Sequence, residues 1–79
     1  MVTGGQIRAA RALLGWSQET LGQTAGVAVR TIRFFEADAR RPHARTLDLL
    51  EVALMGAGIV FLSTDAGTGV LLKVVAVRD

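Results

Sequence analysis

One stretch of the sequence combines arginines and apolar side chains in a spacing suited to contact with DNA bases. If this stretch is helical, one of its faces carries Val29, Arg30, Arg33 and Phe34. Arginine can donate two hydrogen bonds to O6 and N7 of guanine, and an apolar group can contact the methyl group of thymine. Phosphate and sugar receive roughly half to two-thirds of protein–DNA hydrogen bonds, so each arginine could instead contact the backbone. Phe34 could instead pack against the preceding helix or a partner subunit.

Polar residues around that stretch are suited to phosphate contacts. Gln18 stands at the start of the preceding helix, where free backbone N–H groups favour a phosphate oxygen. The alternative for Gln18 is an exposed polar residue without a partner. The further phosphate candidates are Thr31, Arg40 and Arg41, whereas His43 is expected to be an ordinary loop residue.

Capping residues and apolar periodicity predict four helices that position these side chains. Thr3 and Gln6 have the spacing of a capping box, and Ser17 is suited to cap the second helix. Gly15 and Gly26 are typical residues after a helix end. The predicted helices cover residues 4–14, the segment between 17 and 26, 28–37 and 45–57.

A C-terminal β-hairpin is predicted after the helices. Residues 59–62 and 70–77 are rich in strand-forming residues, and residues 65–69 are rich in turn formers. The fold class is therefore mainly α, with a four-helix core over 1–58 and a hairpin over 59–79 in a single domain. Residues 70–77 are apolar on both faces, so we expect them to pair with the same element of a second chain. Folding back over the fourth helix within one chain is the alternative.

Two charged residues are predicted to serve the fold. Arg11 lies next to the inward stripe of the first helix, and Glu36 adjoins Phe35 at the end of the third. We expect Arg11 and Glu36 to form a largely buried ion pair that joins the two helices, because a buried charge requires a partner.

Length, charge and composition restrict the partners. The chain has 79 residues, no cysteine and a net charge of +2. Residues 1–46 hold seven arginines against three acidic residues, and residues 47–79 hold two basic against four acidic residues, so the first half suits nucleic acid. No signal peptide is visible and the apolar runs are far shorter than the about 20 residues of a membrane span, which predicts a soluble cytoplasmic protein. No catalytic, metal-binding or cofactor-binding motif is present, so we expect neither an enzyme nor a cofactor.

The run WSQETLGQTAGVAVRTIRFFEADARRP, followed by TLDLLEVAL, resembles the Cro/C1-type (XRE) helix-turn-helix family over about residues 4–58. The resemblance implies a four-helix lambda-repressor-like core that binds double-stranded DNA. It also implies a phosphate contact for Gln18 and an ion pair between Arg11 and Glu36. In the family, the exposed residues after the turn read bases. The corresponding residues here are Val29, Arg30 and Arg33, and the resemblance extends to Phe34 as a further candidate.

Two positions depart from the family pattern, and the C-terminus differs as well. Ala28 replaces a capping Ser or Thr, which weakens the start of the third helix by about 1 kcal/mol. Asp38 replaces a glycine and must tolerate a left-handed backbone. The hairpin stands where the family usually has a fifth helix, so the family's dimer geometry does not carry over.

These observations lead to two functional hypotheses. The first is a dimeric transcriptional regulator, a repressor that binds a palindromic operator and dimerises through residues 59–79. The alternative is an antitoxin or similar interaction protein, which would hold a protein partner through the same residues and bind DNA for autoregulation.

Overall fold

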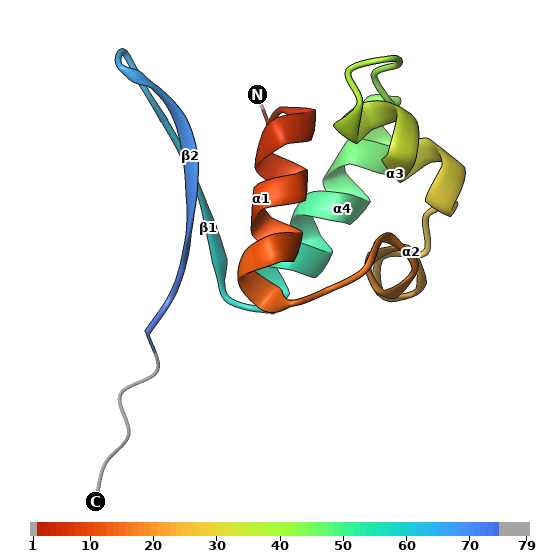
Figure 1. Cartoon of the computed structure of the whole chain (residues 1–79), viewed down its shortest axis with the longest axis horizontal. Helices are drawn as coiled ribbons and strands as arrows, with labels where there is room; N and C mark the ends of the chain where they lie inside the picture. Colours follow the sequence, from red (N-terminus) through yellow and green to blue (C-terminus); the bar gives the residue numbers. More distant parts are fainter. Residues whose placement is uncertain (1, 75–79) are drawn as a thin grey trace, which may run out of the picture.

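The computed structural model of the chain describes residues 2–74, in which four helices precede an antiparallel two-stranded hairpin. The elements are α1 (Gly4–Leu14), α2 (Gln18–Ala25), α3 (Val29–Glu36), α4 (Ala44–Gly56), β1 (Ile59–Thr64) and β2 (Gly67–Leu72). The hairpin lies along one side of α1, and α2 and α3 lie on the other side (Figure 1). This arrangement confirms the predicted fold class, a mainly α chain with a C-terminal hairpin.

The predicted capping residues set the bounds of the first two helices. The Thr3 hydroxyl accepts a hydrogen bond from the backbone N–H of Gln6 (3.1 Å), and Gln6 Oε1 accepts one from Thr3 N–H (2.9 Å). The Ser17 hydroxyl accepts a backbone N–H from the first turn of α2. Gly15 and Gly26 follow α1 and α2 with left-handed backbones, at φ of 70° and 72°. The capping box and the helix stops are therefore confirmed.

The third and fourth helices differ by one residue from their predicted bounds. Ala28 and Ala37 were expected inside the third helix but flank α3, since Ala28 is extended (ψ 136°) and Ala37 has a non-helical ψ of 3°. The fourth helix begins at Ala44 rather than Arg45 and ends one residue earlier than predicted. Neither α3 nor α4 has a side-chain N-cap, so no capping side chain fixes the start of either helix.

The helices pack closely because two glycines permit it. A Cβ atom on Gly4 would clash with the backbone carbonyl of Phe35, so α1 approaches the end of α3 directly. A Cβ atom on Gly22 would lie 2.7 Å from the carbonyl oxygen of Val27, in the turn between α2 and α3. The largest fully buried side chains of the resulting core are Ile7, Leu21, Ile32, Leu50, Leu54 and Ile59.

The two strands form a tight hairpin. Their register runs from Ile59 opposite Leu72 to Thr64 opposite Gly67. The two-residue turn over 65–66 is supported by the Thr64 hydroxyl, which accepts the N–H of Ala66 (3.1 Å). Gly67 has a φ of 146°, a conformation that favours glycine.

The two strands of the hairpin extend closer to the turn than the sequence predicted. The first strand was expected to end at residue 62 and the second to begin at residue 70, because residues 65–69 contain turn formers. In the structure Thr68 and Gly69 are paired across the sheet with Ser63 and Leu62, so cross-strand pairing overrides the weak strand preference of Gly69. The strand β2 ends at Leu72, and residues 75–77 of the predicted strand lie outside the described residues.

The inner face of the hairpin packs within the chain. Ile59 is buried, and Phe61 and Val70, which are paired across the strands, pack against the core. Gln6 of α1 is 5 % exposed, and its Nε2 donates to the carbonyl oxygens of Leu62 (3.0 Å) and Gly69 (2.9 Å). The hairpin therefore folds back mainly over α1, whereas the intrachain alternative considered from the sequence placed it over the fourth helix.

Candidate DNA-binding surface

The helix α3 has one side in the core and one side in solvent. Ile32, Phe35 and Glu36 are buried, whereas Arg30 and Arg33 are exposed on the opposite side. The buried side fixes the helix against α1 and α2, so the two arginines point outward from a fixed support. The residues predicted to face the core are thus buried, and the two arginines predicted to face outward are exposed. The predicted outward residues at the two flanks of the helix are the exception.

Val29 and Phe34 occupy those flanks and are each half-buried. Val29 lies on the α2 side: its Cγ2 would be 3.3 Å from a Cβ atom placed on Gly22. The part of Val29 that remains exposed lies at the start of α3, which is the part of a recognition helix that meets base edges. Phe34 lies on the other flank, beside the loop after α3.

Arg30, Phe34 and Arg40 form one cluster on this flank. The Cζ atom of Arg30 lies 5.2 Å from the centre of the Phe34 ring, within the range of a cation–π contact. These residues, with Thr31 and Pro42, line a cavity of about 150 Å³. Phe34 therefore has an arginine as its neighbour, a contact that the alternatives considered from the sequence did not include.

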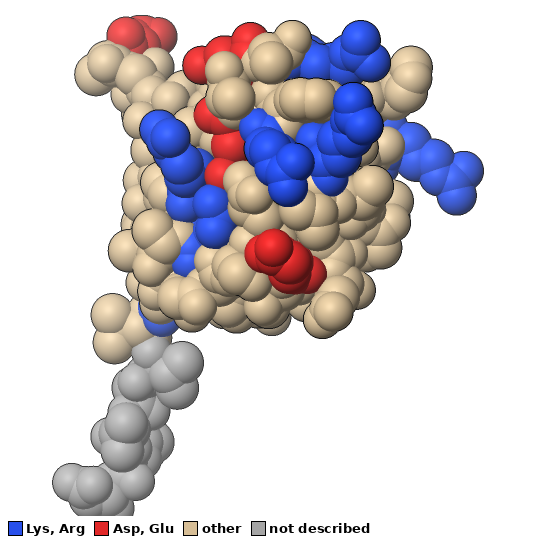
Figure 2. Space-filling model, turned by 45° about the vertical axis from the view of Figure 1, so that its right-hand side comes forward, with Lys and Arg blue, Asp and Glu red and all other residues tan. Residues whose placement is uncertain are grey.

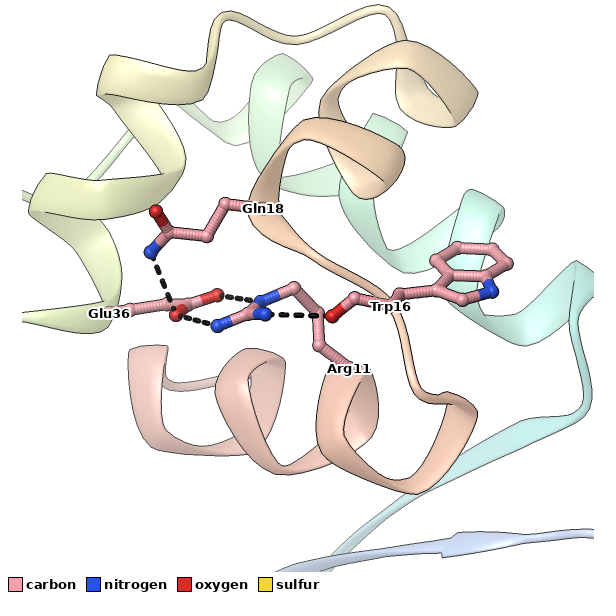
Figure 3. Close-up of polar contacts among 4 residues, drawn as sticks. All are labelled: Arg11, Trp16, Gln18 and Glu36. Carbon is pink, nitrogen blue, oxygen red and sulfur yellow. Dashed lines mark hydrogen bonds and ion pairs between the residues drawn. The ribbon is translucent and has the colours of Figure 1, made fainter.

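Behind the outward face, the expected ion pair between Arg11 and Glu36 is present. Arg11 Nε donates to Glu36 Oε2 and Nη2 donates to Oε1, both at 2.7 Å, while Nη1 donates to the carbonyl of Trp16 at 2.8 Å (Figure 3). The Glu36 side chain is 4 % exposed. Hydrogen bonding to Glu36 raises the pKa of Arg11 above its ordinary value despite the opposing effect of burial. The bidentate pair thus joins α1, α3 and the loop before α2.

Gln18 is a member of the same network. Its Nε2 donates to Glu36 Oε1 at 3.2 Å, so its half-buried side chain turns from the start of α2 toward α3 (Figure 3). An amide nitrogen carries two N–H groups, and this bond uses one of them. The phosphate contact expected of Gln18 would therefore have to use the second N–H group or exchange partners.

The loop after α3 holds the remaining arginines in different ways. Arg40 and Arg41 are both exposed. Arg41 nevertheless has partners within the chain, because its Nη2 donates to the carbonyl of Val2 (3.3 Å) and its Cζ lies 5.6 Å from the centre of the Phe35 ring. Asp38 has a φ of 58°, so this loop adopts the left-handed backbone that the sequence requires there.

Together these side chains make one face of the molecule basic. Figure 2 shows lysine and arginine side chains gathered along the upper part of the face that includes α2 and α3, with acidic groups interspersed. The start of α2, the outward side of α3 and the following loop supply the candidate residues on this face. In this arrangement one helix braces a second whose arginines are free to meet a polyanion.

The sequence did not predict three contacts that candidate residues make within the chain. The Arg30–Phe34 contact had a signal, because residues four apart on a helix are neighbours. The bond from Gln18 to Glu36 spans 18 positions and that from Arg41 to Val2 spans 39. No local pattern indicates contacts over such separations.

The fold and this surface define a helix-turn-helix domain of the kind that binds DNA. A sequence model of a family described as helix-turn-helix matches residues 7–54, which is more than half of the chain. The chain therefore belongs to the Cro/C1-type (XRE) helix-turn-helix family, whose members are DNA-binding regulators. No curated protein matches the sequence. Among residues 2–74, no helix has the length and apolar character needed to cross a membrane.

Proposed function

We propose that this protein is a sequence-specific regulator of transcription that places its third helix in the major groove of double-stranded DNA. This is the helix predicted over about residues 28–37 and found as α3 (Val29–Glu36). The observation that carries the proposal is the pair of exposed arginines, Arg30 and Arg33, on the outward side of a helix held by a buried ion pair. An α-helix fits the major groove, and arginine at its outward positions can read guanine. Val29 and Phe34 flank the two arginines and would contact neighbouring bases.

Phosphate contacts would orient α3 in the groove. Gln18 at the start of α2 and Thr31 on α3 would meet one strand, while Arg40 and Arg41 would meet the backbone from the following loop. These contacts carry no sequence information but dominate affinity and its salt dependence.

We further propose that the protein is a homodimer that pairs through the hairpin region, residues 59–79, with residues 1–58 as the DNA-binding core. Val60 and Leu71 are paired across the strands and share the outer face with Leu62. Leu62 and Leu71 are 41 % and 42 % exposed. A second copy would cover these side chains, and a chain of 79 residues gains stability from such burial. A twofold dimer would place two α3 helices about 34 Å apart, on a palindromic operator.

A dimer of this kind would act as a repressor by occupying its operator and excluding other proteins from it. Selection of bound duplexes from a random pool tests the proposal, and we expect a palindrome with half-sites one helical turn apart. Arg33→Ala should relax the sequence preference, whereas Gln18→Ala should weaken all sites alike. Equal loss on all sequences for Arg33→Ala would contradict its base-reading role.

Sedimentation at micromolar concentration tests the dimer. The unchanged protein should sediment as a dimer, and Leu71→Lys on the outer hairpin face should sediment as a monomer with weakened operator binding. The matched control is Thr68→Lys, at a position near the turn. A monomeric unchanged protein would contradict dimerisation, and it would favour the alternative in which the outer face binds a different protein, as in an antitoxin.

A further inference from the structure

The contact between Arg30 and Phe34 suggests what one part of the operator contains. We propose that this pair reads a two-base step in which a pyrimidine with a 5-methyl group is followed by guanine on the same strand. The step is therefore thymine–guanine or 5-methylcytosine–guanine. This inference rests on the proposed binding of α3 in the major groove and specifies its target.

The first part of the argument is that Arg30 is held in place before DNA binds. Its guanidinium lies over the ring of Phe34, one helical turn along α3, with Cζ 5.2 Å from the ring centre. Within residues 2–74 no hydrogen bond, ion pair or ring contact of this kind holds the side chain of Arg33. Fixing a flexible arginine costs conformational entropy on binding, so the stacked arginine has less entropy to lose.

The second part is the chemistry that a stacked arginine leaves free. The Phe34 ring lies on one side of the guanidinium, and within residues 2–74 no hydrogen bond occupies the N–H groups of the Arg30 side chain, so they remain available. Those N–H groups match O6 and N7 of guanine in a bidentate contact, which requires the guanidinium to lie in the plane of the base. A guanidinium held in one place favours this contact over a phosphate, which can be approached from many directions.

The third part concerns the base on the 5′ side of that guanine. Its C5 substituent projects into the major groove one stacking layer away, over the face of a guanidinium coplanar with the guanine. A methyl group at this position would meet the face of the guanidinium that Phe34 does not occupy, while Phe34 holds the guanidinium from the other side. Arg30 also lines a cavity of about 150 Å³, together with Thr31, Phe34, Arg40 and Pro42, so there is open space next to its side chain for that methyl group.

The methyl group is the shared chemistry, and DNA offers it in two forms. Thymine carries it always, and cytosine carries it only after methylation. The same contact would thus make binding to a cytosine–guanine step depend on methylation of the cytosine. Cytosine itself has only hydrogen at C5, so an unmethylated step should be bound more weakly than either methylated form.

The test compares duplexes that differ by a single methyl group. Selection from a random pool first supplies the operator, in which we expect a thymine–guanine step in each half-site. Replacement of that thymine by deoxyuridine removes only the methyl group and should weaken binding about fourfold, the effect of one buried methyl-sized group. In a second pair of duplexes the thymine becomes cytosine or 5-methylcytosine, and the methylated duplex should bind about fourfold more tightly.

Variants of the protein test whether the effect of the methyl group depends on Arg30 and Phe34. Phe34→Leu keeps an apolar side chain of similar size but removes the ring, and the ratio of thymine to deoxyuridine affinities should fall below about twofold. Arg30→Ala should abolish the preference for guanine. Arg33→Ala is the matched control, because it should lower the affinity for both duplexes and leave their ratio unchanged.

The outcomes separate this inference from the function on which it rests. Selected half-sites that lack a thymine–guanine step, or equal binding of the thymine and deoxyuridine duplexes, would overturn the inference and leave sequence-specific binding intact. A pool with no enriched sequence at all would overturn sequence-specific binding itself and the inference with it.

Discussion

Helix α1 holds the two halves of the molecule by two side chains that differ in charge and in the kind of partner. On one side, Arg11 makes a bidentate ion pair with Glu36 at the end of α3. On the other side, Gln6 donates to the backbone carbonyls of Leu62 and Gly69 in the hairpin. The helix α3 is therefore attached by a charged pair, and the hairpin by a neutral amide.

The difference determines how each attachment tolerates change. The ion pair needs a particular side chain at both ends, and loss of either one leaves a buried charge without its partner. The amide needs a particular side chain only at Gln6, because any residue at positions 62 and 69 supplies a carbonyl. The outer face of the hairpin can thus change its side chains without losing the bond to α1, whereas the end of α3 cannot change Glu36 in the same way.

The largest effect should follow removal of the charged attachment. We expect Arg11→Met to destabilise the protein by about 3–5 kcal/mol, since Glu36 is buried and would lose its bidentate partner. The double variant Arg11→Met/Glu36→Leu should recover part of this loss, because an apolar pair carries no unpaired charge. Chemical denaturation measures both. An Arg11→Met variant as stable as the unchanged protein would show that the two attachments do not differ in the predicted way.

A smaller loss of stability should follow when a side chain is added where α1 and α3 approach each other. Gly4→Ala should destabilise by about 1–3 kcal/mol, because its new methyl group would clash with the rigid backbone of Phe35. Gly5→Ala is the matched control in the next position, where the nearest atom is the Thr3 hydroxyl at 3.8 Å. It should be neutral or stabilising by up to about 1 kcal/mol. Equal melting temperatures for the two variants would contradict the close approach of the helices.

The neutral attachment should be weaker and its loss more local. Gln6→Leu should destabilise by about 1–2 kcal/mol and speed hydrogen exchange in β1 and β2, because the hairpin loses two hydrogen bonds to α1. Thr3→Val removes only the cap of α1, at a cost of about 1 kcal/mol, and should leave exchange in the hairpin unchanged. Faster hairpin exchange in Thr3→Val as well would mean that the cap, and not the amide of Gln6, holds the hairpin.

The two sides of α1 also differ in how far the sequence predicts them. The side toward α3 is predictable, because the capping box, the apolar stripe of the first helix and the arginine beside it all have local spacing. The ion pair follows from that spacing and from the cost of burying a single charge. The outward arginines of α3 follow in the same way from helical periodicity.

The side toward the hairpin is not predictable from the sequence. Gln6 has the pattern of a capping residue, and its oxygen does cap α1, but its nitrogen binds carbonyls 56 and 63 positions away. Backbone carbonyls have no residue type, so the sequence contains no signal for this contact. The start of β2 at Gly67 was missed for a related reason: Gly67 and Gly69 are weak strand formers that are held there by their pairing with β1.

The smallest effects are expected for Arg40 and Arg41 in the loop after α3, where the two variants should change different properties. Arg41 contacts Val2 and the Phe35 ring, and so fastens the loop to the segment before α1, whereas Arg40 lines the cavity beside Phe34. We expect Arg41→Ala to lower stability by about 0.5–1 kcal/mol, the size of an exposed cation–π contact. Arg40→Ala should leave stability unchanged and reduce the slope of log affinity against log salt by about 0.9, because one phosphate is no longer neutralised.

Thermal denaturation and binding titrations over a range of salt concentrations measure the two quantities independently. Because both residues are exposed arginines in one loop, a difference between the variants must come from their surroundings and not from charge. If Arg41→Ala left stability unchanged, as Arg40→Ala should, the contacts of Arg41 with Val2 and the Phe35 ring would not fasten the loop in the free protein. The loop would then contribute nothing to the attachment of α3, which would rest on the ion pair of Arg11 with Glu36 and on the buried side chains of Ile32 and Phe35.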